Sequence, residues 1–337
     1  MSGTIEDFLL SCAATDFGKS DLSESESIFY RRFNYEMVSL CKSLPRSAHT
    51  DSMLFLLQYA GVRLGDDPDF FANYYRPIWS ILYWIGSAHP LAAARLNEKD
   101  LTNAVTGQSM AMFLHSLDDH LTDGQIPVSP LTLLLRSEAW KIMNRALSDL
   151  AGTVRGGEGI LRSFVDDYYA SNQEFNPPES LDDYCDLFRK QMAILMPTPF
   201  LLCMKLTEAM DFTKAIELAY GSFGIAWRLL DDIRDIREDF EQGAESAVYL
   251  CLPDSLKSHW KNGNVGSQAR AKDHADIVLD HILQHGLIDS IKERICAELE
   301  AAATIVQAHN LTGLAAEFRC LALPLRTTGA TQDGHNG

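Results

Sequence analysis

The distribution of proline constrains the fold of this 337-residue chain more than any other feature of its sequence. No proline occurs between Pro199 and Pro253, or between Pro253 and Pro324, so two long stretches lack the residue that most often ends a helix. The sequence also contains no convincing run of alternating apolar and polar residues, the pattern of a half-buried strand. We therefore predict an all-α fold without strands.

Segments rich in Gly, Pro, Asn or Asp separate the helix-sized pieces of the chain. These predicted loops are 64–69, 124–130, 153–159, 176–180 and 261–268. An all-helical domain can hold this length around one elongated core, so we predict that residues 1–325 form a single-domain helical bundle. Residues 326–337 are rich in Thr and Gly with almost nothing to bury, which predicts a disordered tail.

The charge balance excludes one class of partner. The formal net charge is −17, and no run of Lys and Arg could neutralise a row of phosphates, so no nucleic-acid partner is expected. With 46% apolar residues, the chain can still build a sizeable core. A chain this acidic binds a polyanionic substrate only through a few placed cations, or through metal ions that invert the local charge.

The cysteines and the N-terminus indicate a cellular compartment. Seven widely spaced cysteines, with no Cys-x-x-Cys pair, favour a reducing environment. The first residues lack a basic region followed by an apolar run, and no uninterrupted stretch of 18 apolar residues occurs. We expect a cytoplasmic protein without a membrane span.

The segment 222–242 carries acids four residues apart, at Asp231, Asp235 and Asp239. On a helix this spacing places all three on one face, with a drift of about 40° per step. Arg228 falls on the same face one turn earlier, and Asp232 flanks the patch. Apolar residues occupy the opposite side, so the pattern predicts an acidic stripe on an amphipathic helix.

An earlier segment, 105–123, repeats this arrangement. Asp119 and Asp123 are one turn apart, His115 lies a turn before Asp119, and Asp118 is adjacent, about 100° around the helix. Each acidic cluster follows turns that are apolar or small nearly all round, so the acids emerge where a buried helix ends.

Either stripe alone has a simpler interpretation as the solvated face of an ordinary helix. Two stripes at the ends of buried helices weaken that interpretation, because clustered carboxylates repel one another unless cations compensate. Magnesium takes hard oxygen ligands and commonly bridges one or two carboxylates to substrate phosphates. The pattern therefore predicts a Mg²⁺ site that binds a diphosphate.

These residues give the chain a resemblance to the class I isoprenoid synthases, the family of trans-prenyltransferases, squalene/phytoene synthases and class I terpene cyclases. In GIAWRLLDDIRDIRED, Asp231, Asp232 and Asp235 resemble the second aspartate-rich motif of trans-prenyltransferases. Together with the following EQGAESAVYLCLP, the stretch is similar to the squalene/phytoene synthase signature. Asp231, Asp235 and Asp239 are also in the register of the three metal ligands in terpene cyclases.

The first motif of the family is matched more loosely. LHSLDDHLTDG resembles its DDxxD element with Asp118, Asp119 and Asp123, although Asp123 stands one place later than that pattern requires. Arg76 in YYRPIW resembles the end of the element that binds isopentenyl diphosphate, whose earlier basic residues are replaced. The Arg-Arg pair that follows the first motif in the family is absent from 124–130.

The resemblance also implies residues that bind the diphosphate. FRKQMAIL is similar to the Lys-Thr element of prenyltransferases, with Lys190 in the lysine position and Gln191 in place of threonine. Arg228 stands where that group has a glutamine before the second motif. Both cations could grip diphosphate oxygens.

The family fold is a helical bundle around a central apolar cavity with Mg²⁺ ions at its mouth, and its members form dimers, so a homodimer is a further expectation. The resemblance implies that the metal ligands are Asp118, Asp119, Asp123, Asp231, Asp232, Asp235 and Asp239, and that the catalytic residues are Asp118, Asp119, Asp231 and Asp235. Aromatic side chains could stabilise carbocations in the cavity. The candidates are Trp79, Tyr83, Trp84, Phe113, Phe223 and Trp227.

Three functions remain open at this point. The first is a terpene synthase that ionises an allylic prenyl diphosphate and cyclises or deprotonates the cation, which the incomplete isopentenyl diphosphate element favours. The second is a prenyltransferase that couples a prenyl diphosphate to a second prenyl diphosphate or another acceptor, which the phytoene-like motif favours. The third is a helical protein that binds an isoprenoid without turning it over. The substrate's chain length and the product skeleton do not follow from the sequence.

Overall fold

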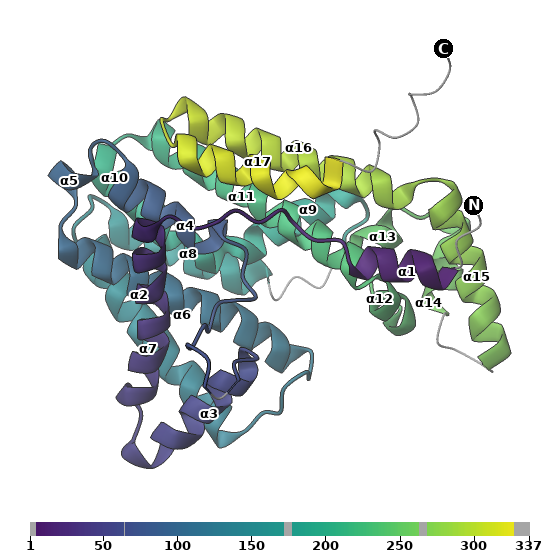
Figure 1. The fold of residues 1–337 in the computed structure, drawn as a ribbon, viewed down its shortest axis with the longest axis horizontal. Coiled ribbons are helices and arrows are strands. Elements are labelled where there is room, and N and C mark those ends of the chain that lie inside the picture. Colours follow the sequence, from purple (N-terminus) through teal and green to yellow (C-terminus); the bar gives the residue numbers. More distant parts are fainter. Residues whose placement is uncertain (1–4, 64, 172–176, 263–267, 327–337) are drawn as a thin grey trace.

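The computed structural model describes residues 5–63, 65–171, 177–262 and 268–326, and within these ranges the regular elements are all helices (Figure 1). In chain order the α-helices are α1 (Ile5–Ala13), α2 (Glu24–Ser43), α3 (His49–Tyr59), α4 (Pro77–Tyr83), α5 (Ala92–Arg95), α6 (Glu98–Thr122), α7 (Pro130–Ala151), α8 (Gly157–Ser171), α9 (Leu181–Gln191), α10 (Pro197–Thr207), α11 (Met210–Arg234), α12 (Ile236–Gln242), α13 (Ala247–Leu250), α14 (Asp254–Lys261), α15 (Gln268–Gln284), α16 (Leu287–Ala308) and α17 (Thr312–Arg326).

The predicted all-α class is confirmed. The predicted loops coincide with breaks between helices where the structure describes them, except that 157–159 form the first residues of α8 and that Pro130, Lys261 and Gln268 are end residues of helices. Of the predicted tail, Arg326 ends α17, and 327–337 lie outside the described residues. No helix in the described part of the chain combines the length and the apolar character that crossing a membrane requires.

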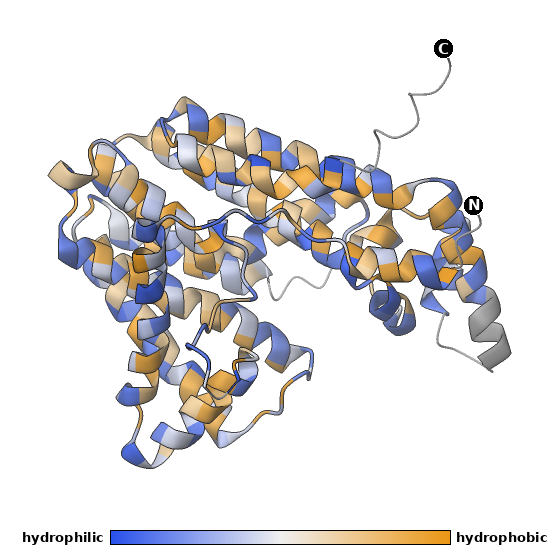
Figure 2. Cartoon of the chain, viewed as in Figure 1, coloured by the Kyte–Doolittle hydropathy of each residue, from blue (hydrophilic) through white to orange (hydrophobic). Residues whose placement is uncertain are grey.

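The two acidic clusters lie at the C-terminal ends of two long helices, α6 and α11. Figure 1 shows α11, α16 and α17 running side by side, while α6 lies with α2 and α7 in the other arm of the bundle. Apolar and hydrophilic residues recur along the outer helices, the pattern of amphipathic helices (Figure 2). The buried apolar side chains of all these helices form one connected core.

The two acidic clusters begin where their helices leave this core. Residues 110–114 of α6 and 223–226 of α11 are almost completely buried, as the sequence predicted. The predicted continuous helix 222–242 is interrupted at Asp235, where α11 ends and α12 begins. The amide of Asp235 still donates to Asp231 O, and that of Asp239 to Asp235 O, so the acids stay in helical register. Beyond the break, Phe240 packs against Trp260 of α14.

The helices α6 and α7 form an antiparallel hairpin that fixes the neighbourhood of the first cluster. Gly124 adopts a φ of +70° just after α6, a conformation that glycine reaches without strain. Ser129 then caps α7 by accepting from the Thr132 amide, and Pro130 occupies the first turn. The short turn brings the first turns of α7 beside the acidic end of α6.

The N-terminal strap, residues 14–23 between α1 and α2, lies against the C-terminal hairpin, which is formed by α16 and α17. The Gly18 amide donates to Leu321 O at 3.0 Å, and the Phe17 ring packs edge-on against Tyr75 at 4.7 Å. Asp16 accepts a hydrogen bond from the Tyr75 hydroxyl at 2.8 Å. The strap thus connects α17 with the segment that precedes α4.

Candidate active site

A cleft of about 950 Å³ opens between α6, α7, α8, α9 and α11, with the segment before α4 as a further wall. It brings together residues from both acidic clusters and two of the predicted diphosphate-binding residues. The predicted site residues that line it are Asp118, Asp119, Asp123, Gln191, Arg228 and Asp231. Two helices distant in sequence therefore contribute carboxylates to one space.

In the first cluster, Asp118 differs from its two neighbours in its partners. Arg136 of α7 donates to both of its oxygens, from Nε to Oδ1 at 2.6 Å and from a terminal nitrogen to Oδ2 at 2.9 Å. Asp119 and Asp123 are exposed to the cleft. Partial burial and the charge of Asp119 raise the pKa of Asp123 above its ordinary value.

In the second cluster, Asp231 is the carboxylate that faces the cleft. Burial, followed by the charge of Asp235, raises its pKa to about 6, although Arg228 acts in the opposite direction. Asp235 is exposed one turn later, outside the cleft lining, and burial of its carboxyl raises its pKa as well. Burial is the main cause of both shifts, and Arg228 and Arg234 offset it only in part.

Asp239 gives the clearest sign that a cation fits this cluster. Its Oδ2 is buried without a well-formed hydrogen bond in the described part of the structure, although the Ser246 hydroxyl, which also lacks one, lies close enough to act against the rise in the pKa of Asp239. Burial, followed by the charge of Asp232, raises the pKa of Asp239 to about 7. An unpaired buried carboxylate oxygen is costly, and a divalent cation with oxygen ligands would satisfy it.

Asp232 has a different position from the one predicted. It is 2% exposed and lies behind the cleft, where Oδ1 accepts from the Tyr184 hydroxyl at 3.1 Å and Oδ2 from the Ala247 amide at 2.7 Å. Its carboxylate also forms an ion pair with Arg228 at 3.2 Å. Because Asp232 is buried, does not line the cleft and has both oxygens engaged in the protein, we leave it out of the proposed metal ligands.

Arg228 lines the cleft and is held in place by aromatic side chains of α9. Its Nε donates to the Tyr184 hydroxyl at 2.6 Å, and its guanidinium lies over the rings of Tyr184 and Phe188. Asp231 lies 3.9 Å from its Nη1. These contacts fix a cation beside the second acidic cluster, as the sequence predicted.

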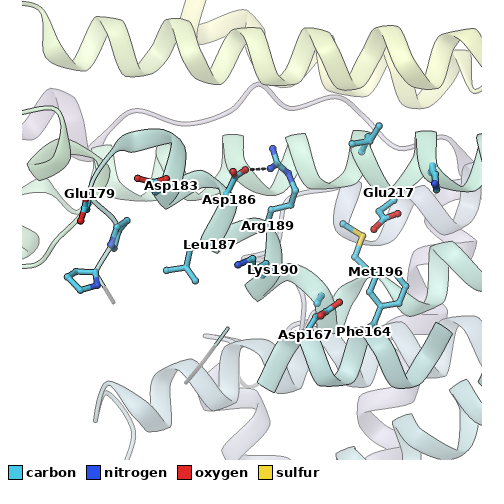
Figure 3. A pocket seen from close by; sticks show the side chains of 15 residues that line it. Phe164, Asp167, Glu179, Asp183, Asp186, Leu187, Arg189, Lys190, Met196 and Glu217 are labelled. Carbon is cyan, nitrogen blue, oxygen red and sulfur yellow. Dashed lines mark hydrogen bonds and ion pairs between the residues drawn. The ribbon is translucent and has the colours of Figure 1, made fainter. Parts of the chain in front are cut away.

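Lys190 and Gln191 point to opposite sides of α9. Gln191 lines the cleft, whereas Lys190 lines a second pocket of about 770 Å³ between α8, α9 and α11 (Figure 3). Leu187 borders both spaces and forms part of the wall between them. The predicted diphosphate contact of Lys190 therefore does not follow from this geometry.

Arg76 also lies outside the cleft. Its guanidinium forms ion pairs with Glu26 and, at 2.9 Å, with Glu317, and it donates to the Ser20 hydroxyl at 2.7 Å. Both glutamates are 5% exposed, so the arginine is the charge that balances them. The structure gives Arg76 a role in joining α2, α4 and α17 in place of the predicted substrate contact.

Aromatic side chains form one wall of the cleft. The Trp227 ring stacks on the His115 ring, with 6.0 Å between the ring centroids. The ring centroids of Tyr74 and Tyr75 each lie 6.3 Å from that of Trp227. Burial, followed by the charge of Arg228, lowers the pKa of His115 to about 4, so the imidazole is neutral. Of the six aromatic candidates, Trp227 is the one among the cleft-lining residues.

Sequence reasoning missed two cations of the cleft, Arg136 and Arg234. Arg136 interrupts the apolar run PLTLLL at the start of α7, and a short turn after the first acidic cluster was the available signal for its position. Arg234 donates to the Tyr75 hydroxyl at 3.2 Å. Three arginines and four carboxylates thus line the same space.

The carboxylates of the two acidic clusters do not converge on a single point. In the described residues, no three His, Cys, Asp or Glu side chains converge tightly enough to hold a metal ion by themselves. Magnesium keeps several waters and substrate oxygens among its six ligands, so a site completed by phosphate is compatible with this spread of carboxylates.

The all-α bundle and the cleft between two acidic helices define a class of fold: the chain has the fold of the class I isoprenoid synthases, as its motifs predicted. Solved structures that it resembles include a geranylgeranyl pyrophosphate synthetase from Pyrococcus horikoshii, with a TM-score of 0.58 and 12% identity over 90% of this chain and 99% of that chain.

Two further solved structures are similar to this chain. An Arabidopsis medium/long-chain prenyl pyrophosphate synthase matches with a TM-score of 0.60 and 13% identity, over 82% of this chain and 97% of that one. A decaprenyl diphosphate synthase from Rhodobacter capsulatus matches with a TM-score of 0.55 and 11% identity, over 90% and 98%. No family model and no curated protein sequence matches the chain. At these identities the likeness establishes the fold, and function has to be argued from the site.

Proposed function

We propose that this protein is a magnesium-dependent enzyme of isoprenoid biosynthesis that ionises an allylic prenyl diphosphate. One observation carries the proposal: carboxylates of α6 and α11 line a single cleft that Arg136, Arg228 and Arg234 also line. Acids alone would suit a cation site, and arginines alone would suit an anion. Their combination suits a diphosphate bound together with metal ions.

The proposed metal ligands are the carboxylates of the two clusters other than Asp232, namely Asp118, Asp119, Asp123, Asp231, Asp235 and Asp239. When bound, Mg²⁺ would supply Lewis-acid stabilisation of the diphosphate as it leaves. Arg228 and Arg234 would hold its oxygens by charge-assisted hydrogen bonds. Gln191, at the end of α9, can orient the same group from the opposite wall.

The aromatic wall suits the other product of ionisation. Breaking the C–O bond leaves an allylic cation, and the ring faces of Trp227, Tyr74 and Tyr75 can stabilise it without acting as nucleophiles. Phe188 and Leu187 add apolar surface that excludes water from the cation. The chain therefore offers both the charged and the apolar parts of such a site.

The first candidate for the fate of the cation is transfer to a second molecule. The three similar structures are named as synthases of prenyl diphosphates, which favours a prenyltransferase that couples two prenyl diphosphates. This candidate requires a second anion site for the diphosphate of the acceptor.

The second candidate is a terpene synthase, in which the cation cyclises or loses a proton. The position of Arg76 favours it, because the one basic residue retained from the isopentenyl diphosphate element is committed to Glu26 and Glu317. Asn73, Tyr74 and Tyr75 line the cleft instead of the missing basic residues.

The deciding experiment incubates the purified protein with Mg²⁺ and geranyl, farnesyl or geranylgeranyl diphosphate, each with and without isopentenyl diphosphate. Organic extracts, taken before and after phosphatase treatment, are analysed by mass spectrometry, and released diphosphate is measured in parallel. A longer prenyl diphosphate, or a head-to-head product, supports the transferase. A hydrocarbon or alcohol from one allylic substrate alone supports the terpene synthase.

The same experiment separates an enzyme from a binding protein. Binding of an allylic diphosphate without any release of diphosphate, under every magnesium condition, would refute the proposed activity. An Asp119→Asn, Asp231→Asn double variant controls for contaminating enzymes, since it removes one cleft-facing carboxylate from each cluster.

A further inference from the structure

Arg136 differs from the other two arginines of the cleft in the residue that it holds. Its two hydrogen bonds to Asp118 form a parallel, bidentate pair, with 35% of the arginine side chain and 15% of the aspartate side chain exposed. Arg228 is held by Asp232 and Tyr184, and Arg234 by Tyr75. Only Arg136 among the three is paired in this way with a proposed metal ligand.

This pairing sets up a competition. Both carboxylate oxygens of Asp118 accept hydrogen bonds from the guanidinium, so the lone pairs that face Arg136 are occupied and the adjacent positive charge repels a second cation. A divalent ion therefore binds Asp118 less tightly while the pair persists. Asp119 and Asp123 carry no such restriction, because they are exposed to the cleft.

We propose that Arg136 is a latch that exchanges partners: it blocks Asp118 in the absence of ligand, and it moves to the diphosphate when metal and diphosphate bind together. This inference rests on the proposed function and adds a positioning residue to it. The metal site is then complete only when the diphosphate is present, because the anion draws off the guanidinium that occupies Asp118.

The chemistry of the guanidinium supports the exchange. Its planar fork matches the spacing of two phosphate oxygens as well as that of a carboxylate, so the same donors can serve both partners. A diphosphate carries more negative charge than one carboxylate and is therefore the stronger partner. Arg136 and Tyr169, which also contacts it, both line the cleft, so the guanidinium already lies in the space where the diphosphate is proposed to bind.

The test measures Mn²⁺ binding by the loss of the free-ion signal in electron paramagnetic resonance, with and without inorganic pyrophosphate. Arg136→Gln should bind Mn²⁺ alone about tenfold more tightly than wild type, a difference of about 1.4 kcal/mol. Pyrophosphate should tighten Mn²⁺ binding to wild type but should give the variant about tenfold less of this gain. Arg145→Gln, on the exposed side of the same helix, should behave as wild type.

Two further variants separate a latch from a simple change of charge. Arg136→Lys keeps the positive charge but loses the fork, so it should also bind Mn²⁺ alone more tightly than wild type. In an Asp118→Asn background, Arg136→Gln should give no further gain, since the blocked ligand is already absent. Thermal melting confirms that each variant is folded.

The proposal is overturned if Arg136→Gln binds Mn²⁺ alone no better than wild type, or if its response to pyrophosphate is unchanged. A gain that persists in the Asp118→Asn background also overturns it, because the effect is then one of charge alone. If wild type fails to bind Mn²⁺ and pyrophosphate together, the proposed function fails first, and that result is distinguishable from the others.

Discussion

The proposed function gives the individual carboxylates of the cleft separable roles. Asp119 and Asp231 face the cleft from different helices, and Asn at either position keeps the shape but removes the charge. We expect each substitution to lower the rate of diphosphate release by about 100-fold or more, as loss of a charge-stabilising contact does. Assay of released diphosphate checks this.

The matched control is Asp186→Asn. Asp186 is an acid of the second pocket, paired with Arg189 (Figure 3). The Asp186→Asn variant should retain wild-type activity. An equal loss of activity in this variant would mean that the overall negative charge of the chain, rather than the carboxylates of the cleft, controls the rate.

The raised pKa values of Asp231 and Asp239 predict how stability depends on pH. Their folded-state values, about 6 and about 7, exceed the ordinary value of 3.8, so the folded state binds more protons than the unfolded state between pH 4 and pH 7. The free energy of unfolding should therefore decrease as pH rises through this window. In EDTA, the melting temperature should be lower at pH 8 than at pH 5.

Magnesium should oppose this loss because it favours the ionised carboxylates. Melting curves at pH 8 should shift upward on addition of Mg²⁺, and the shift at pH 5 should be smaller. An Asp231→Asn, Asp239→Asn variant should show a flatter pH dependence in EDTA. If its dependence equals that of wild type, other groups account for the effect.

At the scale of the element, α11 depends on Asp232 for its position. This buried carboxylate joins α11 to Tyr184 of α9 and to the Ala247 amide at the start of α13, and it also pairs with Arg228 of α11 itself. Asp232→Ala should cost about 3 kcal/mol of unfolding free energy, because it leaves a charge and a buried amide unpaired. Urea unfolding with and without Mg²⁺ measures this.

The comparison that isolates the role of Asp232 is Asp235→Ala. Asp235 is exposed, so its loss should change stability little while reducing the stabilisation by Mg²⁺. If Asp232→Ala instead behaves as Asp235→Ala does, Asp232 acts as a metal ligand after all.

Helical periodicity was sufficient to predict α6 and α11 and the stripes of acid on them, because side chains three and four residues apart share a face. It could not predict which faces of different helices meet. Lys190 and Gln191 are neighbours in sequence yet line different spaces, since one residue turns the side chain by about 100°. Arg136 was missed for a related reason: its partner, Asp118, belongs to another helix.

The fate of Arg76 shows the same limit. The motif around Arg76 suggested a substrate contact. In the structure its guanidinium forms ion pairs with Glu26, far before it in the sequence, and with Glu317, far after it. Such a network depends on tertiary packing, and no local pattern in the sequence announces it.

At the scale of the whole molecule, the N-terminal strap connects the cleft wall with the C-terminal hairpin. A Cβ at Gly18 would lie 2.1 Å from Cys320 O, a backbone atom that cannot swing away. Gly18→Ala should therefore displace the strap at a cost of about 1–3 kcal/mol. It should also weaken pyrophosphate binding, because Asp16 supports Tyr75, which accepts from Arg234.

Calorimetry of unfolding and of pyrophosphate binding checks both parts of this prediction. Gly159→Ala is the control, since a Cβ there meets no atom within 4 Å apart from its chain neighbours and the nearby backbone of its own helix. Loss of stability with full affinity for pyrophosphate would mean that the strap has no influence on the cleft. The homodimer stays a prediction, which sedimentation of the purified protein can test.

The mixed charge of the cleft decides the order in which its ligands arrive. Four carboxylates face three guanidiniums there, on a chain of net charge −17, so a free diphosphate is repelled before it makes contact. The same anion already complexed with Mg²⁺ approaches with much of its charge neutralised. Salt should accelerate the capture of the free anion, by screening the repulsion, and should affect the complex less. On the proposed function, the molecule would therefore select its substrate as a metal complex while that substrate is still in solution.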